Sequence, residues 1–150
     1  MAKALVAYYS LHGNTEKIAR ALAMGLQSGG CDVETVKVDS VEFGKINDID
    51  LLCLGTPVHA WNISRPTKEF LGQLEKLEGF HGKKAFAFDT KFKSRMAGSA
   101  GGKIEKRLKR LGFEIIKPAM SAIVKGTEGP LEEGAEESFR QTGSELASLM

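Results

Sequence analysis

Apolar runs along the chain alternate with stretches whose apolar positions recur at helical spacing. The first, third and fourth runs are nearly continuous, which is typical of central strands covered on both faces, whereas the second alternates and suits an edge strand. The strands expected from these runs are 3–9, 32–38, 50–55, 84–89 and 113–126. Strands that alternate with helices favour a parallel sheet in an α/β fold.

The connections between these runs carry the helical patterns. We expect helices at roughly 14–27, 66–77, 99–111 and 131–148, with a short or irregular crossover around 40–47. Gly29, Gly30, Gly79 and Gly112 stand where these helices should end. The chain has no internal repeat and no linker long enough to separate domains, so we expect a single domain over residues 1–150.

Charge and apolar length exclude several classes of protein. The formal net charge of +2 is too small to indicate nucleic-acid binding. The basic run at 103–110 reads as the solvated face of a helix, because Ile104, Leu108 and Leu111 recur at helical spacing on its other face. The apolar stretches are too short to span a bilayer and no signal-peptide pattern is present, so we expect no membrane association and a cytoplasmic protein.

Cysteine and histidine spacing gives no metal or disulfide pattern. Cys31 and Cys53 have neither metal-ligand nor CxxC spacing, and we expect two unpaired thiols with Cys53 buried. The three histidines, His12, His59 and His81, are far apart in the sequence.

The turn after the first strand is the strongest chemical signal. Residues 10–15 read SLHGNT: neutral donors, one glycine free to take positive φ, and neither Lys nor Arg. A helix that begins directly after such a turn presents backbone N–H groups to an anion such as phosphate. A simple capped loop is the alternative, because Ser, Asn and Thr are also common N-caps.

Two further loops follow the carboxyl ends of predicted strands, where ligands bind in open parallel sheets. The loop after Gly55 carries Trp61, the single tryptophan of the chain, among loop-forming residues, although a core tryptophan is the alternative. The loop after Asp89 carries Phe92 between two lysines, a poor setting for a core side chain. One phosphate turn and two aromatics at one edge of a sheet would suit a flat aromatic cofactor that bears a phosphate.

These residues resemble the flavodoxin family, through VAYYSLHGNTEKIARAL, LGTPVHAW and FDTKF followed by KIEKRLKRLGFEII. The likeness covers nearly the whole chain, in order, at the length of a short-chain member. It implies a flavodoxin-like three-layer sandwich, a five-stranded parallel sheet of order 2-1-3-4-5 with helices on both faces, and FMN as cofactor. The phosphate contacts that it implies are Ser10, Leu11, His12, Gly13, Asn14 and Thr15; the contacts around the isoalloxazine are Thr56, Pro57, Val58, His59, Ala60, Trp61, Asn62, Asp89, Thr90 and Phe92.

The chain departs from the family pattern at several of these positions. Leu11 replaces the usual hydroxyl residue, so its contact with phosphate would come from the backbone. Phe92 stands where Tyr is common, and Asn62 follows the tryptophan where Gly is common. Lys91, Lys93 and Arg95 make the third loop basic, whereas flavodoxins tend to be acidic around the flavin.

Two functions fit this resemblance. The first is an electron carrier that shuttles one or two electrons through non-covalently bound FMN between redox partner proteins, as a monomer or weak dimer. The second is a small FMN-dependent oxidoreductase acting on NAD(P)H or a quinone. The short chain, with little room for a substrate pocket, favours the carrier. A phosphorylated receiver domain is excluded, because Tyr9 and Gly55 stand at the strand ends where it needs carboxylates. A Walker-type site is excluded by the missing GK[ST] signature.

Overall fold

The computed structural model describes residues 1–59, 62–93 and 100–150, without the side chain of His59. A parallel sheet has the strand order β2-β1-β3-β5-β6, with β7 also paired to β5 and the short β4 antiparallel to β3. The strands are β1 Lys3–Tyr8, β2 Asp32–Lys37, β3 Leu51–His59, β4 Asn62–Ile63, β5 Lys84–Phe92, β6 Glu114–Ile115 and β7 Met120–Val124. The helices are α1 Asn14–Ser28, α2 Arg65–Leu74, α3 Gly101–Leu111 and α4 Ala135–Ser148.

The predicted strand order is confirmed, but three strands differ in extent. Strands β3 and β5 continue to His59 and Phe92, past the ends expected at Gly55 and Asp89, so the residues between these positions lie in strands and not in loops. The expected strand at 113–126 forms two pieces, β6 and β7, that pair in parallel with successive parts of β5. Pro118 lies between them and has no N–H to donate, which is a physical reason for the break. The expected crossover at 40–47 is irregular as predicted, with two short 3₁₀ helices at Val38–Ser40 and Phe43–Asp48.

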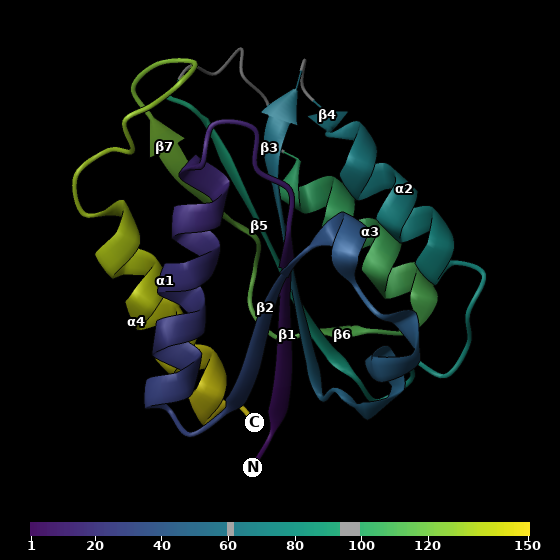
Figure 1. The fold of residues 1–150 in the computed structure, drawn as a ribbon. Coiled ribbons are helices and arrows are strands. Elements are labelled where there is room, and N and C mark those ends of the chain that lie inside the picture. Colours follow the sequence, from purple (N-terminus) through teal and green to yellow (C-terminus); the bar gives the residue numbers. More distant parts are fainter. Residues whose placement is uncertain (60–61, 94–99) are drawn as a thin grey trace.

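Two helix pairs cover opposite faces of the sheet: α1 with α4, and α2 with α3 (Figure 1). The alternation of side chains along β5 divides the core accordingly. Phe86 and Phe88 pack with α1 and α4, whereas Ala85 and Ala87 pack with α2 and α3. The basic face of α3 is solvated as predicted, since Ile104 and Leu108 are fully buried opposite it.

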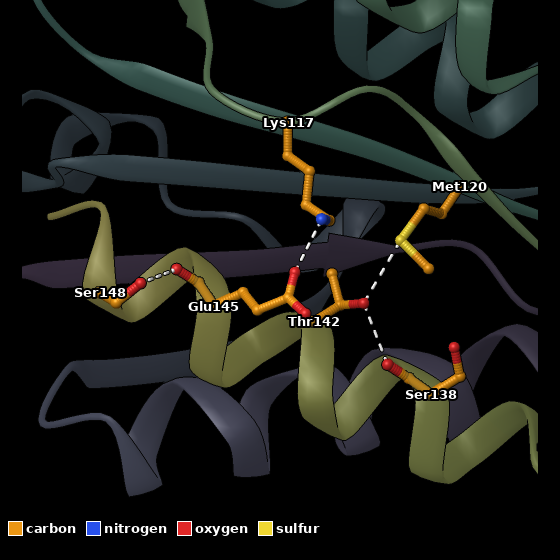
Figure 2. A network of polar contacts seen from close by, with 6 residues as sticks. All are labelled: Lys117, Met120, Ser138, Thr142, Glu145 and Ser148. Atoms are coloured by element: carbon orange, nitrogen blue, oxygen red, sulfur yellow. Dashed lines mark hydrogen bonds and ion pairs between the residues drawn. The ribbon is translucent and has the colours of Figure 1, made fainter.

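The helix α4 is held by polar as well as apolar contacts. Lys117 Nζ lies 2.7 Å from Glu145 Oε2, and the buried Thr142 hydroxyl donates to the Ser138 carbonyl at 3.0 Å, beside the sulfur of Met120 (Figure 2). Gly25 of α1 and Gly143 of α4 let the two helices touch, because a Cβ at Gly25 would overlap the Arg140 carbonyl. In the described ranges, no helix is long and apolar enough to cross a membrane.

Candidate functional site

The register of the sheet brings three loops to one edge. Tyr8 of β1 is aligned with Gly55 of β3, and Gly55 is aligned with Phe88 of β5. These strands run parallel, so the segments that follow them start side by side at the carboxyl end of the sheet (Figure 1). This is the edge where ligands bind in open α/β sheets.

The first segment connects β1 to α1. Gly13 has a φ of +88°, which favours glycine, and the backbone enters the helix directly after it. Among the described residues, no side chain caps the N-terminus of α1. The first N–H groups of a helix have no partner within the helix, so this end of α1 can donate to an anion. Of the two alternatives for this turn, the geometry disfavours the simple side-chain-capped loop.

Ser10 supplies an independent observation on this turn. Its Oγ is enclosed by protein and has no hydrogen-bond partner within the described residues. A buried hydroxyl without a partner costs on the order of 1–3 kcal/mol. A phosphate oxygen would accept the Ser10 proton, so the residues present fit a phosphate-bearing group.

The other predicted residues of the turn divide into buried and exposed positions. Thr15 is buried and its hydroxyl lies 2.8 Å from that of Thr90. Asn14 is also buried, close to Gly129 in the turn that follows β7. The side chains of Leu11 and His12 are exposed, and their contact with a cofactor stays a prediction.

The second segment is anchored by a cluster of buried hydroxyls. Thr56, Ser64 and Thr67 lie with their oxygens 2.8–3.2 Å from one another, and the Ser64 N–H also donates to Thr56. The cluster joins the end of β3 to the start of α2. Ser64 and Thr67 were not predicted as functional residues, although the run SRPT before an apolar periodic stretch signals a helix N-terminus.

The other predicted residues of this segment are either half-buried or outside the described residues. Pro57, Val58 and Asn62 are half-buried, and Asn62 Oδ1 accepts the N–H of Ile63. Ala60, Trp61 and the His59 side chain lie outside the described residues, so the stacking role expected of Trp61 stays a prediction.

The third segment begins with a fully buried carboxylate. Asp89 Oδ2 accepts the N–H groups of Ala100 and Gly101 at 3.0 and 2.9 Å, so it holds the start of α3. Phe92 is 42% exposed, as expected of a side chain outside the core, and Lys93 is exposed beside it. Arg95 lies outside the described residues.

Neither thiol contributes reactive chemistry to the site. Both are free and buried, as predicted, and burial raises the pKa of Cys31 and, strongly, that of Cys53. Tyr8 lies beneath α1, where burial and the nearby Glu16 carboxylate raise the pKa of its phenol. The described residues contain no group of His, Cys, Asp and Glu side chains that could hold a metal ion.

Comparison with known proteins identifies this arrangement. The family model described as Flavodoxin matches residues 6–141. A probable flavodoxin 2 of Bacillus subtilis (strain 168) is 30% identical over 139 residues, which cover 89% of each chain. The structure of oxidised flavodoxin 1 from Bacillus cereus superposes with a TM-score of 0.86 at 20% identity, over 99% of both chains.

The same fold also occurs within longer proteins. A rubredoxin oxygen:oxidoreductase of Desulfovibrio gigas superposes with a TM-score of 0.82 at 21% identity, over 98% of this chain but 35% of that one. The family match, by contrast, spans most of the present chain in sequence. The protein therefore belongs to the flavodoxin family, whose members bind FMN and transfer electrons.

Proposed function

We propose that this chain is a carrier that passes electrons between separate redox partner proteins, with FMN held by the segments 10–15, 56–62 and 89–92. The observation that carries this assignment is the buried Ser10 hydroxyl, which has no hydrogen-bond partner in the part of the chain that the structure describes, beside an N-terminus of α1 that no described side chain caps. Both features are unfavourable in isolation and both are satisfied by one phosphate group.

Bound FMN supplies the one- and two-electron redox chemistry, and the protein supplies binding and orientation. Ser10, Thr15 and the first backbone N–H groups of α1 would donate to the phosphate. The hydroxyl cluster of Thr56, Ser64 and Thr67 would hold the loop beside the ring system, and Asp89 would fix the entry into α3. The hydrogen bonds of these side chains support the proposed roles.

A carrier is favoured over an enzyme with its own substrate. The buried Asp89 carboxylate binds backbone N–H groups at the start of α3, and both thiols are buried, so these groups are engaged structurally and not available for acid–base or nucleophilic catalysis. The expected monomer or weak dimer, cytoplasmic location and lack of nucleic-acid binding belong to the same proposal.

The test begins with the purified protein. A visible flavin spectrum and release of FMN on denaturation are expected. The holoprotein is then mixed anaerobically with NADH or NADPH, with and without a quinone. A carrier is not bleached rapidly by either nucleotide, whereas rapid bleaching and turnover would overturn the carrier assignment in favour of an NAD(P)H or quinone oxidoreductase.

A further inference from the structure

Two hydroxyls from distant parts of the chain meet behind the phosphate turn. Thr15 belongs to the first turn of α1 and Thr90 to β5, and their oxygens lie 2.8 Å apart. Both side chains are almost completely buried, at 2% and 5% exposure. Thr90 follows Phe88 on the face of β5 that α1 covers, so the pleat of the strand directs it toward α1.

The direction of this hydrogen bond has a functional consequence. Each hydroxyl has one proton to donate, and either could be the donor in the pair. A phosphate oxygen accepts hydrogen bonds, so a Thr15 hydroxyl that donates to phosphate has no proton left for Thr90. Thr15 must then accept, and Thr90 must donate.

We propose that Thr90 is a positioning residue for phosphate binding: its hydroxyl donates to Thr15 and so directs the Thr15 proton to the FMN phosphate. This inference rests on the proposed phosphate turn and changes the expected role of Thr90, which the family resemblance places beside the isoalloxazine. Thr90 is well suited to the task, because its backbone is fixed between Pro57 of β3 and Ala122 of β7. Strand β5 thereby sets the orientation of the Thr15 hydroxyl, which is carried by α1.

The test compares FMN with riboflavin, which lacks the phosphate, in fluorescence titrations of the apoprotein. Thr90→Val keeps the shape and removes the proton, and we expect it to weaken FMN about three- to tenfold. Riboflavin affinity should stay unchanged, and Thr90→Ser, which retains the hydroxyl, should restore FMN affinity. Thr142→Val is the matched control, because it removes an equally buried hydroxyl from α4 (Figure 2) and should leave FMN affinity unchanged.

A double-mutant cycle separates positioning from direct contact. In a Thr15→Val background, the further change Thr90→Val should have no effect on FMN affinity. Additive losses would overturn the proposal, because Thr90 would then act on the cofactor independently. Equal losses for FMN and riboflavin, or no loss with Thr90→Val, would also overturn it.

The same titrations distinguish this proposal from the one on which it rests. If Thr15→Val and Ser10→Ala weaken FMN and riboflavin equally, the phosphate turn itself is wrongly assigned. If those two variants are selective for FMN and Thr90→Val is not, only the positioning role of Thr90 fails. Thermal melts of each apoprotein identify any variant that does not fold. If Thr90→Val does not fold, Thr90→Ala removes the same proton in a smaller side chain and is compared with Thr90→Ser, which retains it.

Discussion

The Asp89 carboxylate lies 2.9 Å from the backbone nitrogen of Gly101, the first residue of α3. The same oxygen also accepts the N–H of Ala100, so one buried side chain of β5 holds the start of α3. A charged acceptor at a helix start contributes through hydrogen bonds and through the helix dipole.

Asp89→Ala should therefore destabilise the apoprotein by about 1–3 kcal/mol. Asp89→Asn keeps an acceptor in the same place and should lose less. Urea denaturation monitored by circular dichroism measures both changes. Equal losses for the two variants would show that the negative charge, and not the hydrogen-bond geometry, dominates.

Ser10→Ala should weaken cofactor binding without lowering the stability of the apoprotein. It removes a buried hydroxyl that has no partner among the described residues, so apoprotein stability should not fall, while FMN affinity weakens by about 1–3 kcal/mol through loss of a charge-assisted bond. Riboflavin affinity should stay constant. Ser144→Ala, at the contact of α4 with Gly25, is the control that leaves both affinities unchanged. A destabilised Ser10→Ala apoprotein would contradict this reading of the turn.

Thr67→Val opens the hydroxyl cluster at the base of the second loop. Thr56 and Ser64 each lose a partner in a buried setting, so apoprotein stability should fall by about 1–2 kcal/mol. Because this loop would lie beside the ring system and not the phosphate, FMN and riboflavin should weaken together. Isothermal titration with both ligands measures this, and a selective loss of FMN would place the loop beside the phosphate instead.

Stability at alkaline pH should report the buried Cys53 thiol. Burial raises the pKa of this thiol in the folded state. In the unfolded state the thiol has the ordinary cysteine pKa of about 8.5. Above that pH the folded state binds more protons, so the free energy of unfolding falls as pH rises; below it the contribution is constant. Cys53→Ala should reduce the slope by up to about 1.4 kcal/mol per pH unit. Part of the slope should remain in this variant, because the pKa values of Tyr8 and Cys31 are also raised in the folded state. An unchanged slope in urea titrations at several pH values would contradict the burial argument.

The basic residues at the carboxyl end of β5 should tune the flavin. Positive charges at Lys91 and Lys93 would favour a more negative, fully reduced cofactor, so Lys91→Glu with Lys93→Glu should move the second one-electron potential to more negative values. The expected shift is on the order of tens of millivolts at low salt and smaller at high salt, because exposed charges are screened. Lys76→Glu with Lys109→Glu matches the charge change at positions away from the three loops. A spectroelectrochemical titration that shows equal shifts for both double variants would mean that the lysines do not face the flavin.

Much of the fold could be read from the sequence because its signals are local. The continuous apolar runs around Val6, Cys53 and Phe86 give central strands, and all three side chains are fully buried. The division of the last strand was missed because Ile116 looks like a strand residue, while the break depends on the missing N–H of Pro118.

The candidate site was less accessible from sequence. SLHGNT has a local pattern that signals a turn and a helix start, and the structure adds that no described residue is hydrogen-bonded to the Ser10 hydroxyl. The pair Thr15 and Thr90 is separated by 75 positions, and only the packing of α1 on β5 brings it together. The hydroxyl cluster around Thr56 likewise depends on tertiary contacts, so it could not be predicted from the individual residue types.

The close approach of Gly25 and Gly143 has a consequence for biosynthesis. It packs α1 closely against α4, so the helix that carries the phosphate turn depends for one of its buried contacts on residues 135–148. During translation α1 is synthesised early, and its contact with α4 cannot form until most of the chain has been synthesised. Contacts between such distant segments form late, after the intervening loop entropy has been overcome. A nascent chain halted on the ribosome before α4 should thus be unable to retain FMN, which makes cofactor loading a late event in the maturation of this protein.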